Sequence, residues 1–390
     1  MSSFENALQR QLEKIKQDSL LRHRKSLQTP QQPNIKIAGK DFLAFCSNDY
    51  LGLANHPEVA DAMVLGAKNW GTGSGASHLI VGHQQVHHDL EQALADFVGY
   101  PRALLFSTGY MANIGAIRSL VGQHDAIFHD DLNHASLLDG GWLSRAECQR
   151  FAHNDYQELE SCLQASQKLS ADTKRLVISD GLFSMDGDIA DIPRLSAIAK
   201  QQDAWLMIDD AHGLGVLGER GSGILSHWGV SDEAVEVYVG TLGKAFGCSG
   251  AFVAGSELVI ETLIQRARTY IYTTSLPPAV AAANLKALEI VCKDQWRRDK
   301  LNELISYFRC EAEKLGLPVL PSTTAVQPVL YKSVEKTLQV SAALEEQGIL
   351  VTAIRPPTVP VGSSRLRVTL SASHSKQDVQ TLTQALAKAS

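Results

Sequence analysis

A lysine surrounded by glycines is the clearest candidate for covalent chemistry in this sequence. Lys244 lies in the stretch TLGKAFG, residues 241–247, just beyond the apolar run Val237–Val239. Most lysines point into water, but one in a desolvated pocket has a lowered pKa and can act as a nucleophilic amine. Thr241 adds a hydroxyl for a phosphate. The stretch predicts a Schiff-base lysine, and an ordinary exposed lysine is the alternative for the stretch taken alone.

A carboxylate and a histidine follow a second apolar run, Trp205–Ile208. Asp209 comes directly after that run, and His212 stands three residues further on. An acid at the end of a buried strand could bind a metal or a cationic ring. The alternative is that Asp209 only caps the turn that follows.

A turn of small residues follows a third apolar run. Residues 103–106 are apolar, and Ser107, Thr108, Gly109 and Tyr110 come next, where a helix begins. The backbone N–H groups and the dipole of a helix start attract phosphate, so the turn predicts a phosphate site. A plain helix cap is the alternative.

A histidine follows a fourth apolar run. His134 lies in the stretch NHAS, residues 133–136, past the run 126–129. Its flat ring could stack on a planar cofactor, and a purely structural role is the alternative.

The glycine-rich stretch GTGSGAS, residues 71–77, invites a dinucleotide interpretation that its context excludes. The dinucleotide fingerprint needs a preceding strand and an acid about 20 residues later. Residues 61–70 look helical instead. We expect the glycines to let the backbone pass close to a ligand or to a partner subunit.

Taken in chain order, these parts match what pyridoxal 5′-phosphate requires. The cofactor needs an anion site at a helix start, a carboxylate near its ring nitrogen and an amine that holds it covalently. Gly109, Asp209 and Lys244 provide these three groups, and His134 provides a stacking ring. In an open α/β sheet, ligands bind beyond the carboxyl ends of the strands, where all four residues are predicted to lie.

The elements that position these residues alternate along the chain. Short apolar runs lie at 103–106, 126–128, 176–178, 205–208 and 237–239, with helical stretches such as 191–201 between them. This pattern predicts an α/β fold with a mostly parallel central sheet and helices on both faces. A smaller C-terminal α+β domain should follow. We expect an N-terminal helix over 1–28 with a short hairpin at 34–45, a large domain over 46–280 and a small domain over 281–390.

The small domain should begin with a long helix that runs to about residue 315. After it, the sequence predicts a strand at 327–331, a helix at 336–347, strands at 349–354 and 365–371, and a final helix at 376–388.

Composition excludes several classes of function. The 390 residues carry a net charge of −6, with no basic block, which argues against nucleic acid or anionic membrane as a partner. No apolar run approaches the ~20 residues of a membrane span, and the N-terminus lacks a signal-peptide pattern. None of the six cysteines forms a C-x-x-C pair or stands in zinc spacing, so we expect no metal site and a cytoplasmic location.

At this point the sequence resembles the α-oxoamine synthases, pyridoxal-phosphate enzymes of fold type I. The likeness runs from FCSNDYLG at 45–52 to RLR at 365–367, nearly the whole chain. Between these ends it is carried by NHAS at 133–136, FSMDGD at 183–188, DDAHG at 209–213 and TLGKAFG at 241–247.

Within the family, the stretch VTAIRPPTVP at 351–360 is most similar to the branch that serves biotin biosynthesis. That resemblance implies a decarboxylative condensation of L-alanine with a pimeloyl thioester, carried by acyl carrier protein or by CoA. The alternatives are a glycine-accepting member, such as 2-amino-3-ketobutyrate CoA ligase or 5-aminolevulinate synthase, another fold-type-I enzyme such as an aminotransferase, and a non-catalytic binding member.

The resemblance also implies roles for single residues. Lys244, His134 and Asp209 would be catalytic. The residues implied to contact the cofactor are these three with Thr108, Gly109, Tyr110, Ser184, His212, Thr241, Thr273 and Thr274. The residues implied to contact substrate are Arg22, Asn48, His134, Arg355, Thr358 and Arg367.

A homodimer with shared active sites is also implied. Residues 270–275, YIYTTS, would lend a hydroxyl to the partner's phosphate site. The alternative for that segment is a strand with polar edges.

Overall fold

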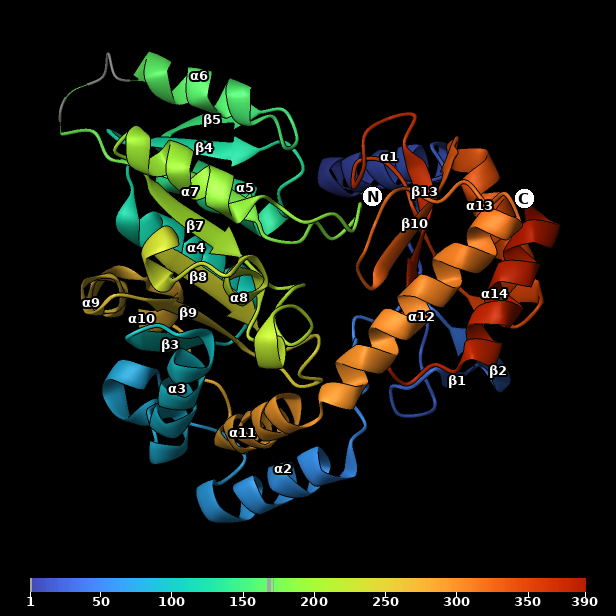
Figure 1. The fold of residues 1–390 in the computed structure, drawn as a ribbon, viewed down its shortest axis with the longest axis horizontal. Coiled ribbons are helices and arrows are strands. Elements are labelled where there is room, and N and C mark those ends of the chain that lie inside the picture. Colours follow the sequence, from blue (N-terminus) through green and yellow to red (C-terminus); the bar gives the residue numbers. More distant parts are fainter. Residues whose placement is uncertain (1, 167–169, 171) are drawn as a thin grey trace. The chain divides into compact units, whose positions relative to one another are not determined.

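The computed structural model describes residues 2–166, 170 and 172–390. The chain divides into two compact units (Figure 1). The small unit comprises Met1–Ser47, Met185–Gly187 and Lys300–Ser390, and the large unit comprises Asn48–Ser184 and Asp188–Asp299.

The large unit is built on a central sheet that is mostly parallel, as the alternating pattern predicted. Among the described residues the sheet has seven strands. In spatial order they are β3 (Arg102–Phe106), β9 (Ala251–Gly255), β8 (Val237–Thr241), β7 (Trp205–Asp209), β6 (Arg175–Asp180), β4 (Ala126–Asp130) and β5 (Glu147–Phe151). Strands β5, β4, β6, β7 and β8 run parallel, whereas β9 is antiparallel to both β8 and β3.

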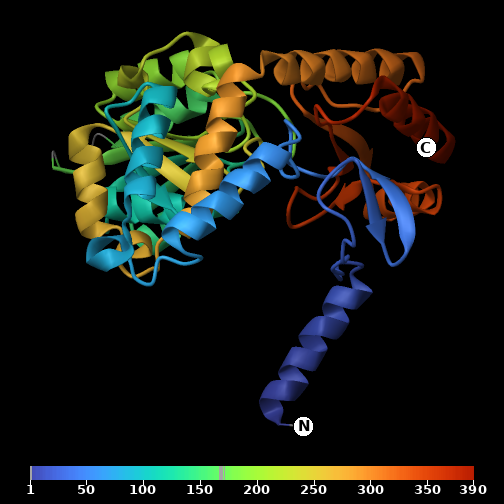
Figure 2. The same cartoon turned by 90° about the horizontal axis from the view of Figure 1, so that it is seen from below.

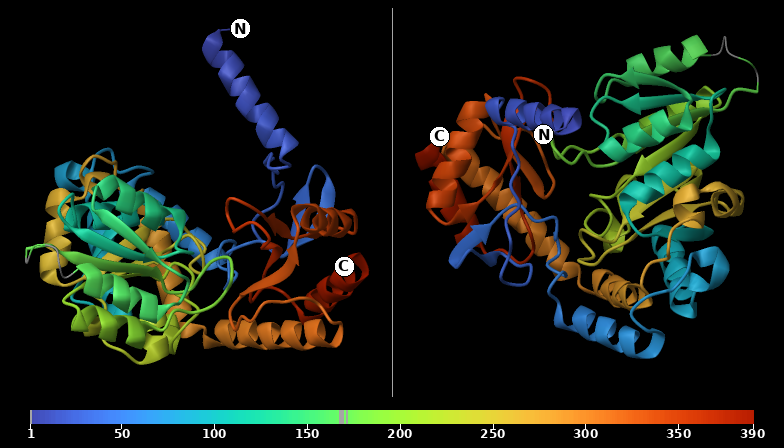
Figure 3. Two further views of the ribbon diagram at one scale, coloured as in Figure 1. Left: turned by 90° about the horizontal axis from the view of Figure 1, so that it is seen from above. Right: turned by 180° about the vertical axis from the view of Figure 1, so that it is seen from behind.

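Helices cover both faces of this sheet. Helices α4 and α5 pack against each other on one face, where α9 and α10 join α4; Figure 3 shows this face in its right-hand view. Helices α6 and α7 pack on the other face. The helices of the large unit are α2 (Pro57–Trp70), α3 (Gln85–Val98), α4 (Gly109–Leu120), α5 (Ala135–Ser144), α6 (Tyr156–Ser166), α7 (Ile192–Gln201), α8 (Ile224–Trp228), α9 (Glu257–Arg266), α10 (Arg268–Ile271) and α11 (Pro278–Lys293). Short turns of π- or 3₁₀-helix are η1 (His78–Gly82), η2 (Glu219–Gly221) and η3 (Asp232–Ala234).

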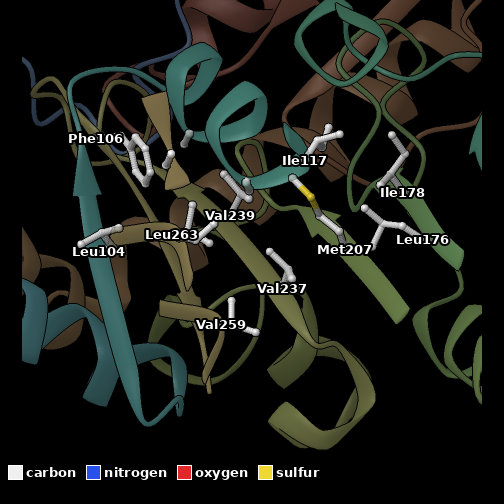
Figure 4. Close-up of a cluster of buried hydrophobic side chains, with 14 of the residues drawn as sticks. Leu104, Phe106, Ile117, Leu176, Ile178, Met207, Val237, Val239, Val259 and Leu263 are labelled. Carbon is white, nitrogen blue, oxygen red and sulfur yellow. The ribbon is translucent and has the colours of Figure 1, made fainter. Parts of the chain in front are cut away.

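The main core lies between the sheet and helices α4 and α9, which cover one of its faces. Figure 4 shows Met207, Val237 and Val239 from the central strands meeting Ile117 of α4 and Leu263 of α9. All five side chains are almost fully buried. Full burial of one such side chain stabilises the fold by about 1.5–3 kcal/mol, so this layer holds the carboxyl ends of the strands in fixed positions.

Two strands of the sheet were not predicted. Strand β5 reads ECQRF and is mostly exposed at the sheet edge, so it lacks an apolar run. Strand β9 reads AFVAG and is fully buried, but its small residues and glycine gave a weak signal.

The small unit contains two short sheets. One consists of β1 (Asn34–Ile37), β2 (Lys40–Ala44) and β11 (Ile349–Leu350), and the other consists of β10 (Val326–Lys332), β13 (Ser364–Thr369) and β12 (Thr352–Ile354). Strands β1 and β2 form the predicted hairpin at 34–45. The predicted strand at 349–354 is instead two strands, which break at Val351 and join different sheets.

The N-terminal helix is shorter than predicted. Helix α1 spans Ser3–Gln17 rather than 1–28, and Figure 2 shows it extending from the rest of its own unit. It ends because Asp18 caps it and Ser19 takes a left-handed φ of 56°. None of its described residues is buried, so Phe4, Leu8 and Leu12 remain exposed.

The long helix predicted after residue 278 is two helices. Helix α11 ends at Lys293, and α12 (Gln295–Lys314) begins beyond Asp294. The remaining helices are α13 (Val334–Glu346) and α14 (Lys376–Ala389), close to their predicted ranges. Across the part of the chain that the structure describes, no helix combines the length and the apolar character that a membrane span needs.

Candidate active site

The carboxyl ends of the parallel strands bring several predicted residues to one edge of the large unit's sheet. Strand β7 ends at Asp209, strand β8 ends at Thr241 and strand β6 ends at Asp180. Asp180 and Asp209 are direct register partners on neighbouring strands. Two carboxylates therefore stand side by side at the edge where an open α/β sheet binds its ligands.

Asp209 is buried and held by two hydrogen bonds. Its Oδ2 accepts a bond of 2.6 Å from Nδ2 of Asn113, and its Oδ1 accepts one of 2.9 Å from the backbone N–H of Ala211. The second bond is the turn cap that was considered as the alternative role. The first fixes the carboxylate against helix α4, so capping and ligand binding are compatible.

Asp180 differs electrically from its neighbour. Burial raises the pKa of its carboxyl well above the usual range, and the charge of Asp209 raises it further. Its Oδ2 accepts a bond of 2.7 Å from the backbone N–H of His134. The raised pKa favours a protonated Asp180.

His134 stands at the start of α5 with its side chain exposed. Its Nδ1 lies 2.8 Å from Oγ of Ser136, and its ring meets the ring of Tyr110 edge-on at 6.5 Å. Desolvation lowers the pKa of His134, Lys244 lowers it further and Asp209 opposes them. The charges of Lys244 and Asp209 thus both act on this ring, so three predicted residues from separate loops lie together.

The start of helix α4 lies at the turn that was predicted to bind phosphate. Thr108 caps the helix, and its Oγ1 accepts a bond of 3.2 Å from the N–H of Met111. The cap role considered as the alternative is therefore present. A Cβ placed on Gly109 would lie 3.9 Å from Oγ1 of Thr241, so this turn adjoins the end of β8. The first N–H groups of a helix have no acceptor within it and are suited to an anion.

The loop that carries Lys244 depends on a glycine. Gly247 has a φ of +67°, and a Cβ there would lie 2.3 Å from the backbone N of Ala54. Its N–H donates a bond of 2.8 Å to the carbonyl of Lys244. Both the left-handed backbone and the close approach require glycine, which fixes the course of the loop around the half-buried Lys244.

His212 is positioned by a tyrosine from a distant part of the sequence. Its Nδ1 lies 2.6 Å from the hydroxyl of the buried Tyr50. The same hydroxyl lies 3.5 Å from Oδ1 of Asn48, another predicted site residue. The stretch FCSNDYLG therefore orients a residue of the stretch DDAHG.

The remaining predicted residues of the large unit lie at Ser184 and in the segment after α10. Ser184 is half-buried at the end of the unit's segment Asn48–Ser184. Thr273 and Thr274 follow α10 in an irregular segment, so the alternative that 270–275 forms a strand is wrong. Arg268 and Tyr270 already belong to the helix, which excludes an extended backbone there.

Four predicted residues lie in the small unit. Nη2 of Arg355 donates a bond of 3.1 Å to the carbonyl of Leu21, which places Arg355 beside the exposed Arg22. Thr358 is exposed, and its N–H bonds the carbonyl of Arg355 at 3.1 Å. Arg367 is buried on β13, where its Nη1 bonds Oγ1 of Thr369 at 3.1 Å.

The glycine-rich stretch at 71–77 has no dinucleotide geometry. It follows the predicted helix, α2, rather than a strand. Gly71 and Gly75 have positive φ, and a Cβ on either would meet no described atom within 4 Å. Backbone conformation accounts for these two glycines within the chain.

Sequence reasoning missed Asn113, Asp180 and Tyr50. Asp180 could have been found, because it ends an apolar run as Asp209 does. Asn113 and Tyr50 carried no local signal, since their partners are 96 and 162 residues away.

The chain is similar to known proteins over nearly its whole length. Residues 40–386 match the family described as aminotransferase class I and II. A curated 8-amino-7-oxononanoate synthase of Pseudomonas savastanoi pv. phaseolicola is 58% identical over 97% of this chain and 94% of its own length. One from Stutzerimonas stutzeri is 57% identical over 95% of this chain and 93% of its own.

Solved structures agree. A serine palmitoyltransferase of S. paucimobilis, determined with a bound PLP–myriocin aldimine, superposes with a TM-score of 0.92 at 29% identity, covering 100% of this chain and 98% of that chain. An 8-amino-7-oxononanoate synthase of Francisella tularensis gives a TM-score of 0.78 at 30% identity, covering 89% of this chain and 97% of that chain. The predicted fold is confirmed, and so is the resemblance. The chain belongs to the 8-amino-7-oxononanoate synthases within the aminotransferase class I and II family.

Proposed function

We propose that this chain condenses L-alanine with a pimeloyl thioester, releasing CO₂ and a free thiol and forming 8-amino-7-oxononanoate for biotin biosynthesis, with pyridoxal phosphate as its cofactor. One observation carries the proposal. The edge that joins Asp209, His134, Lys244 and the start of α4 belongs to a chain 58% identical to curated 8-amino-7-oxononanoate synthases.

The residues at this edge fit pyridoxal phosphate. The start of α4 supplies N–H donors for the phosphate, with Thr108 and Thr241 beside it. Asp209, anchored by Asn113, would hold the ring nitrogen. Lys244 would supply the amine. His212, oriented by Tyr50, would bond the ring oxygen, and His134 would stack on the ring. Ser184 would add a further contact.

When bound, pyridoxal phosphate supplies an electron sink for negative charge at the α-carbon of the amino acid. Asp209 would keep the ring nitrogen protonated through a charge-assisted hydrogen bond. The raised pKa of Asp180 is consistent with a single negative charge at this point. Asp180 then serves to hold the backbone of His134 rather than to compete for the ring nitrogen.

Lys244 and His134 move and orient protons. Nζ of Lys244 takes the proton from the α-carbon of alanine, since an amine in this position can act as a general base. The lowered pKa of His134 keeps its ring neutral near pH 7. A neutral imidazole can donate one hydrogen bond, and we assign that bond to the substrate carboxylate or to the thioester oxygen.

The small unit recognises the two substrate carboxylates in this proposal. Arginine suits a carboxylate because its guanidinium fork matches both oxygens. Arg367 binds the carboxylate of alanine. Arg355 and Arg22, brought together by the bond from Arg355 to Leu21, form a cationic patch for the far carboxylate of the pimeloyl chain, with Thr358 beside it.

We further propose a cytoplasmic homodimer in which Thr273 and Thr274 reach the phosphate site of the partner. The irregular backbone after α10 leaves both hydroxyls outside any strand ladder, which supports a contact across a subunit interface. All six cysteines are free thiols, as suits a reducing compartment. A monomer that is fully active at nanomolar concentration, by light scattering and assay, contradicts the shared site.

Product analysis tests the function. The purified enzyme is supplied with pimeloyl-CoA or pimeloyl acyl carrier protein and with alanine, glycine or serine in turn, and the products are identified by mass spectrometry. We expect 8-amino-7-oxononanoate from alanine, and the better thioester identifies the carrier. A higher kcat/KM with glycine than with alanine assigns the chain to a glycine-accepting synthase instead.

A further inference from the structure

Three side chains with metal-binding atoms converge at the start of helix α3. They are His83, His88 and Glu91, and one ligand atom from each lies within 4.8 Å of the other two. The group lies in the large unit, between the π-turn η1 and the first two turns of α3. The function proposed above uses none of the three.

Helical spacing explains why they face one another. His88 and Glu91 are three residues apart on α3, so their side chains share one face of the helix. His83 immediately precedes the helix cap, and its Nε2 lies 3.9 Å from Oε2 of Glu91. The chain therefore presents two imidazoles and one carboxylate to a common point.

The surroundings hold two of these ligands in orientation. Nδ1 of His83 lies 2.9 Å from Nδ1 of His78, which directs Nε2 of His83 toward Glu91. The ring of His78 is itself stacked on Tyr270, with centroids 4.8 Å apart and planes 9° from parallel. The other oxygen of Glu91, Oε1, accepts a bond of 2.9 Å from the backbone N–H of Leu105.

This pattern is what metal sites in proteins use. A ligating histidine typically bonds a fixed partner through its second ring nitrogen, and a ligating carboxylate is itself hydrogen-bonded. Two histidines and one glutamate form a known zinc ligand set, with water in the fourth position. An ion pair between His83 and Glu91 alone would leave the convergence of His88 without a role.

We propose that His83, His88 and Glu91 bind a divalent transition-metal ion, with Zn²⁺ as the best match to the ligand set. Zinc–ligand bonds of 2.0–2.2 Å in a tetrahedron place ligand atoms roughly 3.4 Å apart. The spacing here needs only a modest contraction, and His88 is exposed and can rotate into place. The bound ion would join the segment before α3 to the helix itself.

The expectation that the chain has no metal site rested on cysteine spacing alone. Histidine and glutamate contributed nothing to that reasoning.

Calorimetric titration with Zn²⁺ tests the proposal on the holoenzyme. The protein carries no histidine tag, and excess pyridoxal phosphate is removed because it chelates zinc. We expect one site per chain. The variants H88A and E91Q should each lose more than the ~10- to 100-fold in affinity that removal of an outer partner costs, and H78F should lose about that amount. H124A, which removes an exposed histidine outside the group, should bind as the parent does.

Two controls keep the result decisive. Circular dichroism and bound-cofactor absorbance verify that each variant is folded. E91Q retains an oxygen for the Leu105 N–H, so loss of zinc in this variant does not follow from loss of that bond. Unchanged zinc affinity in both H88A and E91Q, or no zinc binding by the parent at micromolar concentration, overturns the proposal.

Discussion

Nδ2 of Asn113 donates a 2.6 Å hydrogen bond to Oδ2 of Asp209 and so ties helix α4 to the end of strand β7. Asn113 lies one turn into helix α4, at whose start we propose that the phosphate binds. The same residue therefore couples two parts of the proposed cofactor site, the anion site and the carboxylate. This bond also sets the direction in which the carboxylate points.

Replacing Asn113 should weaken cofactor binding. A hydrogen bond to a charged group contributes about 1.5–3 kcal/mol, so Asn113→Ala should raise the dissociation constant of pyridoxal phosphate roughly ten- to hundred-fold. Equilibrium dialysis of the cofactor measures the change. Asn302→Ala, on the exposed surface of α12, is the matched control and should leave the constant unchanged.

Lys244 should carry the covalent link to the cofactor. Borohydride reduction of the parent should fix pyridoxal phosphate to the peptide that contains Lys244, and Lys244→Ala should lose that label. Lys200→Ala, at an exposed position of α7, should keep it. A label that persists in Lys244→Ala places the reactive amine elsewhere.

The glycine of the lysine loop should not tolerate a side chain. Gly247→Ala meets a left-handed φ and backbone atoms 2.3 Å from the new Cβ, so the loop must shift. We expect a fall in thermal stability together with reduced cofactor loading. Gly122→Ala, where the added Cβ has no described atom within 4 Å, is the control, and equal effects in the two variants would refute this explanation.

Deprotonation of His153 should lower the stability of the fold at alkaline pH. Its ring nitrogens each lie 2.9 Å from a carboxylate, Asp130 on one side and Asp188 on the other. Burial alone lowers the pKa of His153, but the bonds to both carboxylates outweigh it and raise the pKa to about 10, from an ordinary value of 6.5. The protonated ring therefore stabilises the folded state.

This stabilisation is complete below about pH 6.5 and is lost as the pH rises through about 10. The melting temperature of the parent should fall across that window. His153→Phe removes the cationic partner of the two carboxylates and should melt lower than the parent at pH 6, with the difference shrinking toward pH 10. A difference that stays constant from pH 6 to 10 would show that His153 is not charged in the folded protein.

Features that depend on a local sequence pattern could be predicted, whereas contacts between distant residues could not. Lys244, Asp209 and the turn at Gly109 each end or follow an apolar run, so local pattern sufficed to find them. The partnership of Tyr50 with His212 spans 162 residues and has no local pattern. Strand β5 was not predicted because an edge strand is half exposed and lacks an apolar run. Helix α1 was predicted too long because its apolar spacing continues past Asp18 to Leu20 and Leu21.

Arg367 should bind the carboxylate of alanine. Loss of one charge-assisted contact costs about 1.5–3 kcal/mol, or roughly ten- to hundred-fold in binding. Arg367→Ala should weaken the binding of alanine by that factor in spectral titrations of the holoenzyme and leave cofactor binding unchanged. Arg367→Lys retains the positive charge but lacks the guanidinium fork, so its affinity for alanine should lie between those of the parent and of Arg367→Ala. Alanine affinity equal to that of the parent in Arg367→Ala excludes this assignment.

The far carboxylate of the acyl chain should be the target of Arg355. Its guanidinium donates a hydrogen bond to the carbonyl of Leu21, so Arg355 contacts the residue that precedes Arg22 in the small unit. Arg355→Ala should raise the KM for the pimeloyl thioester and spare alanine. The exposed Arg24, two residues beyond Arg22, offers Arg24→Ala as a charge-matched control. Selectivity between pimeloyl and uncharged heptanoyl thioesters decides the point, because only a residue that contacts the terminal carboxylate can alter that ratio. If Arg355→Ala keeps the selectivity of the parent, the residue serves only to hold the segment at Leu21 in place.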